Sequence, residues 1–138
     1  MNLLISFFLI ALGTYWTLTQ PELRLQTPCE EKTIVKAAEP VILLGKSKAQ
    51  VHARIDTGAT YSSMDKELAK KLGFNQVIGE VEIRNAHGVT YRPLVKVSFL
   101  LKGKSHQDAF SLADRTQLQH PVLIGRSSLK GYLVDPQE

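Results

Sequence analysis

Short segments of alternating polarity, separated by turn residues, fill the chain from Thr33 onwards. In residues 51–55 and again in residues 95–99, every second side chain is apolar. A period of two predicts strands with one face toward a core, because successive side chains of a strand point to opposite sides. This pattern limits the folded part of the chain to a mostly β structure.

Turn residues predict how these strands are connected. Further strands are predicted at residues 41–44, 81–84, 89–94 and 122–124, and another carries Phe110 and Leu112. The tetrapeptide Asn85-Ala86-His87-Gly88 is expected to form the tip of a β-hairpin, and residues 102–104 a second turn. The predicted topology is therefore a set of short strands joined by tight turns.

One helix is expected among the strands. Ser62 stands three residues before Asp65, a spacing that resembles a capping box at a helix N-terminus. Met64, Leu68 and Leu72 recur on one helical face, and Gly73 is a typical C-terminal stop. We expect this helix to pack its apolar face on the sheet.

Size and charge restrict the functional classes. The 138 residues suit one ordinary domain, so a two-lobed enzyme does not fit in the chain. The net charge of +4 comes from basic residues spread along the sequence, without a basic run interleaved with aromatics. The composition therefore favours a globular domain and argues against a nucleic-acid partner.

The N-terminus has a different character. Residues 3–18 are almost wholly apolar and uncharged, which predicts a signal peptide or membrane anchor within residues 1–20; a buried core helix is the alternative. A linker is expected at residues 21–32 and the folded domain at residues 33–138. Cys29 is the only cysteine, so no intrachain disulfide can form. We expect a periplasmic or cell-envelope location, exported or attached to the membrane through residues 3–18.

The run Asp56-Thr57-Gly58-Ala59 follows directly on the alternating strand at residues 51–55. A carboxylate at the end of a strand can reach a cleft, and the small Gly58 lets the backbone approach and support it. An acid-base peptidase needs two carboxylates facing one water, and this run supplies one. An ordinary strand-to-loop turn is the simpler interpretation of the same residues.

Together with the C-terminal run Val122-Leu123-Ile124-Gly125-Arg126, this motif resembles the retropepsin-like aspartic peptidases. The similarity covers roughly residues 33–138 and is greatest to a bacterial branch labelled ATP-dependent zinc protease. The Arg92-Pro93, Asp114-Arg115 and Val134-Asp135-Pro136 elements follow in that branch's order. The resemblance implies a single-lobe retropepsin-like acid-protease barrel with one or two short helices.

The same resemblance implies an aspartic endopeptidase that works as a homodimer on a peptide or protein substrate. Asp56, Thr57 and Gly58 would be catalytic, with Thr57 in the interlocked loops under the two aspartates. Substrate-binding residues would be Ala59, Thr60 and the hairpin-tip residues Asn85, Ala86, His87 and Gly88, which would form a flap. Structural support would come from Leu123, Ile124, Gly125 and Arg126, with Asp114 and Arg115 in the network of Arg126.

The sequence departs from the branch in two respects. Thr60-Tyr61-Ser62 replaces the usual basic residue and Thr-Ser, and the short hairpin tip lacks the multiple glycines of a mobile flap. The branch label itself has no support in the residues, because the sequence has no His-Glu-x-x-His motif and no glycine-rich phosphate loop. His52, His87, His106 and His120 lie far apart in the sequence. We therefore predict neither a metal site nor another cofactor.

Two other functions fit the same sequence. A non-catalytic module on this fold could capture an extended peptide by strand pairing. A peptidase of this kind could also trim amino-acid tails added by peptide ligases, which the resemblance to the branch implies. The predicted function is peptide hydrolysis by a pair of Asp56 side chains.

Overall fold

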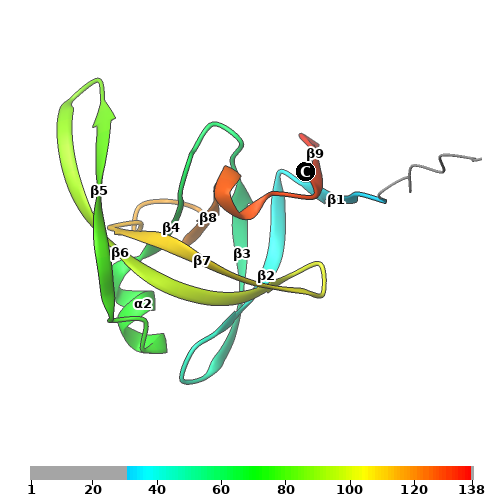
Figure 1. Cartoon of the computed structure of the whole chain (residues 1–138), viewed down its shortest axis with the longest axis horizontal. Coiled ribbons are helices and arrows are strands. Elements are labelled where there is room, and N and C mark those ends of the chain that lie inside the picture. The colour runs from blue at the N-terminus through cyan, green and yellow to red at the C-terminus, as the bar shows by residue number, and fades with distance from the viewer. Residues whose placement is uncertain (1–30, 138) are drawn as a thin grey trace, which may run out of the picture. The chain divides into compact units, whose positions relative to one another are not determined.

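The computed structural model describes residues 31–137 (Figure 1). The predicted targeting segment, most of the predicted linker and Cys29 lie outside the described residues. Within residues 31–137, no helix is long and apolar enough to cross a membrane.

Strands dominate the described part of the chain. They are β1 (Thr33–Lys36), β2 (Ala38–Leu44), β3 (Lys48–Ile55), β4 (Ser62–Asp65), β5 (Val77–Asn85), β6 (Gly88–Leu101), β7 (Lys104–Ala113), β8 (Val122–Ile124) and β9 (Tyr132–Asp135). The helical elements are α2 (Lys66–Leu72) and the 3-10 turn η1 (Arg126–Ser128). This composition confirms the mostly β prediction with one or two short helices.

Six strands close into a barrel. Hydrogen-bonded neighbours follow the order β2, β3, β8, β4, β7 and β6, and β6 pairs with β2 again to close the ring. Both β3 with β8 and β4 with β7 run parallel, whereas the hairpin partners run antiparallel. Closure leaves few free strand edges, which stabilises a small sheet domain.

The barrel interior is apolar. The largest fully buried side chains are Phe99, Phe110, Leu43, Met64, Leu72, Leu101 and Ile124. Ala53 and Ile55 of β3 are buried while His52 and Arg54 are exposed, so the alternation seen in the sequence faces the core as predicted. The buried odd positions of β6, at Val95, Val97 and Phe99, follow the same rule.

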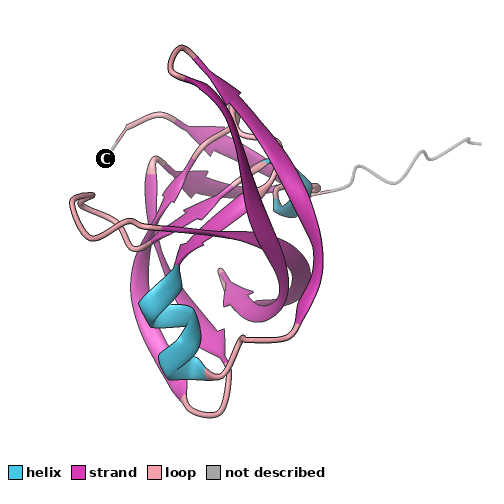
Figure 2. Ribbon diagram, turned by 90° about the vertical axis from the view of Figure 1, so that its left-hand side faces the viewer, coloured by secondary structure: helices cyan, strands magenta, loops and turns pink. Residues whose placement is uncertain are grey.

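Strands β5 and β6 extend beyond the barrel as a hairpin arm (Figures 1 and 2). Their register pairs Asn85 with Gly88, so two residues form the turn, and Gly88 adopts a φ of 123°. The hairpin tip predicted from the sequence is thus confirmed. In Figure 1 the tip and the loop after β3 lie at the same end of the domain.

The predicted helix start was wrong. Ser62 and Met64 belong to β4, and the N-cap is Asp65, whose carboxylate accepts hydrogen bonds from the backbone of Glu67 and Leu68 at 3.1 Å each. Pairing of β4 with both β7 and β8 holds these residues extended, which overrides the local capping signal. Gly73 ends the helix with a left-handed φ of 81°, as predicted.

The sequence analysis did not predict the pairing of the two ends of the described domain. β1 and β9 form a separate two-stranded parallel sheet, in which Ile34 lies opposite Leu133. Both of these side chains are more than half exposed, whereas Val35 is fully buried. The sheet therefore turns one apolar face inward and leaves an apolar pair outside.

Candidate active site

Asp56 follows the last residue of β3, at the point where β3 lies beside β8. Its backbone N–H donates to the carbonyl of Ile124 at 3.0 Å, which ties the start of the loop to the end of β8. The Asp56 residue is half-buried, and its carboxylate accepts a hydrogen bond from the Gly58 N–H at 2.8 Å. This contact fixes the orientation of the carboxylate at the start of the loop.

The rest of the loop, residues 57–61, is fastened to residues 125–127. The N–H groups of Arg126 and Ser127 donate to the carbonyls of Ala59 and Thr60, at 2.9 and 3.1 Å. The Arg126 guanidinium donates to the Thr60 hydroxyl at 2.9 Å. The segment that the sequence analysis assigned to structural support thus holds the loop that carries Asp56.

Gly125 allows this close approach. A Cβ at this position would lie 2.6 Å from the carbonyl carbon and oxygen of Tyr61 and 3.0 Å from the Ala59 oxygen. These atoms are backbone and cannot move aside cheaply. A glycine is therefore required for the loop and the end of β8 to lie this close together.

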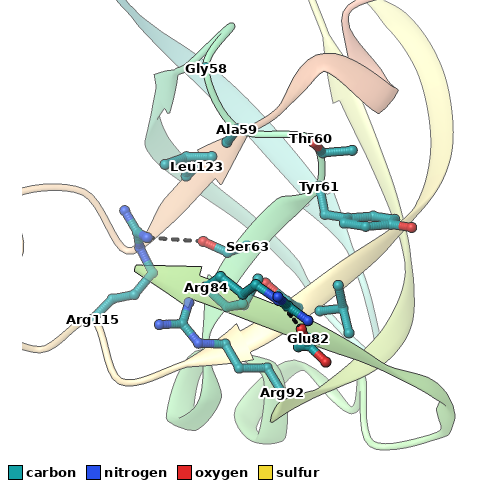
Figure 3. A pocket seen from close by; sticks show the side chains of 13 residues that line it. Gly58, Ala59, Thr60, Tyr61, Ser63, Glu82, Arg84, Arg92, Arg115 and Leu123 are labelled. Atoms are coloured by element: carbon teal, nitrogen blue, oxygen red, sulfur yellow. Dashed lines mark hydrogen bonds and ion pairs between the residues drawn. The ribbon is translucent and has the colours of Figure 1, made fainter. Parts of the chain in front are cut away.

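A cleft of about 430 Å³ opens between this loop and the β5–β6 arm (Figure 3). Gly58, Ala59, Thr60 and Tyr61 form its loop side, and residues 81–84 form its hairpin side. Leu123 also lines the cleft, whereas Ile124 is fully buried in the core. Strand residues of the arm, rather than its tip, face the loop across this space.

The predicted site residues are therefore only partly brought together. Ala59 and Thr60 line the cleft, but the tip residues Ala86, His87 and Gly88 are exposed and do not line it. Thr57 is exposed on the loop. Asp56 itself lies two residues before the first residue that lines the cleft.

The cleft is also lined by three arginines, which the sequence analysis did not predict there. Arg84 pairs with the Glu82 carboxylate on the surface of the hairpin. Arg115 is only 8% exposed; its guanidinium donates to the Ser63 hydroxyl at 2.9 Å and to the His120 carbonyl at 3.1 Å. Arg92 reaches the cleft from β6 (Figure 3).

Arg92 and Arg115 place positive charge beside the cleft. No carboxylate of the described residues lies within salt-bridge distance of either guanidinium. Burial lowers the pKa of Arg115 below its ordinary value, the nearby charge of Arg92 lowers this pKa further, and Asp65 opposes both. The cleft therefore holds positive charge that an anionic group could neutralise.

These contacts separate residues that the sequence analysis had joined. Arg115 was expected in the network of Arg126, but it binds Ser63 and His120, whereas Arg126 binds Thr60. Asp114 accepts hydrogen bonds from Thr116 on the surface. No signal in the sequence indicates this separation: both residues follow the end of β7 at Ala113, but Asp114 is exposed and Arg115 is buried.

Metal-binding side chains are not clustered in the described part. Among residues 31–137, no three His, Cys, Asp or Glu side chains come close enough to hold an ion. His106 instead contacts the Tyr132 hydroxyl at 2.6 Å and stacks on Phe99.

Comparison with known proteins gives a family and a fold. The model of a family described as RimB-like, retropepsin-like aspartic endopeptidase RimB, matches residues 64–138, a range that begins after the Asp56 motif. No curated protein matches the chain.

Solved structures share the barrel at low sequence identity. A Legionella pneumophila protein of unknown function, Lpg0085, has a TM-score of 0.55 at 19% identity, over 77% of this chain and 95% of its own. The simian foamy virus protease has a TM-score of 0.51 at 15% identity, over 67% and 90%. A foamy viral protease-reverse transcriptase scores 0.56 at 20% identity, over 74% of this chain and 13% of its own. The predicted single-lobe protease barrel is confirmed.

Proposed function

The chain belongs to the RimB-like family of retropepsin-like aspartic endopeptidases, and from this premise we propose that it hydrolyses peptide bonds as a homodimer. Asp56 of each subunit would contribute one of the two carboxylates. The observation that carries the proposal is the Asp56 side chain itself, half-exposed at the end of β3 and supported by the Gly58 N–H. One such carboxylate is half of an acid-base site.

The chemistry needs both carboxylates because they share one proton. The ionised carboxylate takes a proton from the water, whose oxygen adds to the substrate carbonyl carbon. The protonated carboxyl donates its proton to the carbonyl oxygen, giving a tetrahedral diol. Breakdown of the diol cleaves the C–N bond: the carboxyl that took the water proton gives it to the leaving nitrogen, and the other carboxylate takes a proton from a diol hydroxyl. No covalent enzyme intermediate forms.

The exposure of the loop supports a two-fold assembly. Thr57 and Gly58 are exposed in the single subunit, next to the half-exposed Asp56. A second subunit that covers this loop would bring its own Asp56 to the same water and would exclude bulk solvent from it. The N-terminal apolar segment supports a cell-envelope location for this dimer.

The charge of the cleft supports acidic substrates. Arg92 and Arg115 line the cleft without a salt bridge to any carboxylate of residues 31–137, and Arg guanidinium groups bind carboxylates through paired hydrogen bonds. Peptides with Asp or Glu near the cleaved bond are therefore the substrate class that we propose. Trimming of acidic tails added by peptide ligases would be one form of this activity.

Two alternatives remain outside the proposal. A metal-dependent peptidase, as in the branch label, would need a donor cluster that residues 31–137 do not supply, so no step is assigned to a metal ion. A binding module would use the same cleft without turnover, and the pairing of Asp56 across subunits distinguishes the two.

Substitution of Asp56 tests the hydrolytic proposal. We expect purified full-length protein to cleave denatured casein, with products identified by mass spectrometry, and the Asp56→Asn variant to lose this activity by at least about 1,000-fold, since an amide cannot act as the base. Asp114→Asn, an exposed substitution outside the cleft, serves as the matched control and should retain activity. Unchanged turnover in Asp56→Asn would exclude the proposal.

Paired peptides test the acidic preference. For peptides that differ only by Glu or Gln beside the cleaved bond, we expect the wild type to favour Glu in kcat/KM by roughly 10-fold or more, since hydrogen bonds between charged groups contribute about 1.5–3 kcal/mol. Arg92→Gln should remove most of this preference while cleaving the Gln peptide normally. Equal kcat/KM values of the wild type for the Glu and Gln peptides would contradict the proposed acidic preference.

A further inference from the structure

A chain of hydrogen bonds runs behind the Asp56 loop and ends at a carboxylate. The Gly125 N–H donates to the Ser62 hydroxyl at 3.0 Å, and the Ser62 and Ser128 hydroxyls lie 3.0 Å apart. The Ser128 hydroxyl in turn donates to the Asp108 carboxylate at 2.5 Å. These groups come from β4, β7, the end of β8 and η1, so the chain joins four separate segments.

The direction of each hydrogen bond follows from chemistry. A backbone N–H can only donate, so the Ser62 oxygen accepts from Gly125 and its hydrogen is free to point at Ser128. Ser128 then accepts from Ser62 and gives its own hydrogen to Asp108, because an ionised carboxylate can only accept. Reversing any step would leave a buried hydroxyl without an acceptor, since Ser62 is fully buried and Ser128 is 6% exposed.

Two residues of this hydrogen-bond series, Ser62 and Gly125, border the active-site loop. Ser62 directly follows Tyr61, the last residue of the loop, and Gly125 directly follows Ile124, whose carbonyl accepts the Asp56 N–H. The Ser62 to Gly125 contact therefore clamps the loop exit to the strand end that also fixes the loop entrance. Asp108 lies on β7 and accepts the last hydrogen bond of the series, from Ser128.

We infer that Asp108 is a positioning residue for Asp56, acting through Ser128, Ser62 and Gly125. The inference rests on the proposed function for its consequence in catalysis, but not for its structural part. The charge of Asp108 polarises both serine hydroxyls in one direction, and hydrogen bonds to an ionised acceptor are stronger than neutral ones. Loss of the Asp108 carboxylate leaves the buried Ser128 hydroxyl without an acceptor and loosens the clamp at both ends of the loop.

Amide hydrogen exchange on the full-length protein tests the structural part without any substrate. In Asp108→Ala, the amides of Gly125, Arg126 and Asp56 should exchange roughly 10-fold faster or more, while those of helix α2 keep wild-type protection. Asp108→Asn retains one acceptor oxygen for Ser128 and should give an intermediate effect. This graded rescue is not expected of a residue that merely fills space.

Two neighbouring serines provide a matched pair. Ser128→Ala should reproduce the exchange pattern of Asp108→Ala, because it removes the central link. Ser127→Ala should not, because the Ser127 hydroxyl is buried but makes no hydrogen bond to any residue that the structure describes. Both serines lie in the same 3-10 turn, so general damage to η1 would affect them alike.

Kinetics tests the catalytic part. On denatured casein, Asp108→Ala should lower kcat about 10-fold with KM changed less than about twofold, because the hairpin side of the cleft, formed by residues 81–84, is not part of the clamp. Wild-type exchange at Gly125 and Asp56 in Asp108→Ala would overturn the inference, and so would equal acceleration in α2, which would mean general destabilisation. If the exchange pattern appears but the wild type cleaves no peptide, the clamp stands and the proposed function fails.

If Asp108→Ala does not fold, the comparison of Ser128→Ala with Ser127→Ala decides. Local acceleration at Gly125 and Asp56 in the first variant alone supports the clamp. Equal exchange in the two variants overturns it.

Discussion

At the scale of single residues, His106 shows how burial shifts a side-chain pKa. The ring is half-buried on β7, stacked on Phe99 and in contact with the Tyr132 hydroxyl. Burial lowers the pKa of His106 below its ordinary value of 6.5, the Lys104 ammonium lowers the pKa further, and Asp108 opposes both. Relative to the unfolded chain, the folded protein therefore favours the neutral ring, because the attraction of Asp108 does not outweigh burial and the charge of Lys104.

This preference predicts a pH dependence of stability. Below pH 6.5 the unfolded chain takes up a proton at His106 before the folded chain does, so the free energy of unfolding should fall as the pH decreases toward the lowered pKa. Above pH 6.5 the residue contributes no pH dependence. Urea titrations at pH 7.5 and 5.0 should show a smaller decline for His106→Gln than for the wild type. Gln107→Ala, an exposed change on the same strand, should decline as the wild type does.

At the scale of elements, one side chain joins three parts of the barrel. Asp65 ends β4, caps α2 through Glu67 and Leu68, and accepts the backbone N–H of Arg115 at 3.0 Å. It is 8% exposed, so these donors have little access to water as a replacement. The same carboxylate therefore starts the helix and positions the segment that presents Arg115 to the cleft.

Removal of this carboxylate should destabilise the domain more than an ordinary cap. We expect Asp65→Ala to cost roughly 2–4 kcal/mol of unfolding free energy, combining a lost N-cap with an unsatisfied buried N–H at Arg115. Glu67→Ala, in the exposed first turn of α2, should change stability by less than about 0.5 kcal/mol. Chemical denaturation measures both. Similar losses for the two variants would show that the contact with Arg115 contributes little.

The elements also show what the sequence could and could not predict. Alternation and short apolar runs identified most of the barrel strands, but not β1, β4 or β9, and the Gly73 stop identified the helix end, because these signals are local. The helix start was misplaced, because pairing of β4 with β7 and β8 is a long-range effect. The arginine pair was missed for a similar reason: Arg92 and Arg115 are remote in sequence, and the antiparallel pairing of β6 with β7 brings them to one cleft. The motif of Asp56 was found because its residues are contiguous.

At the scale of the whole molecule, the proposed chemistry depends on a second copy. One subunit offers one Asp56, an exposed loop, and an outer face of the β1–β9 sheet on which Ile34 and Leu133 are 59% and 51% exposed. Burial of such apolar pairs contributes to association, and no other strand of residues 31–137 pairs with the β1–β9 sheet, so a second copy could extend it. Because one subunit supplies only one of the two carboxylates, we expect the dimer to be active and the monomer to be folded but inactive.

Mixing of subunits tests this dependence directly. If the active unit is a dimer with one Asp56 from each chain, a mixed dimer of wild-type and Asp56→Asn subunits has a single carboxylate and should be inactive. With a ninefold excess of Asp56→Asn, random pairing should leave roughly one tenth of the casein hydrolysis that the same amount of wild type shows alone. Asp56→Asn that also carries Ile34→Ser and Leu133→Ser should inhibit less, if the β1–β9 sheet contributes to association. Undiminished activity at every ratio, with both chains shown to exchange, would place the complete site within one subunit and rule out a shared pair.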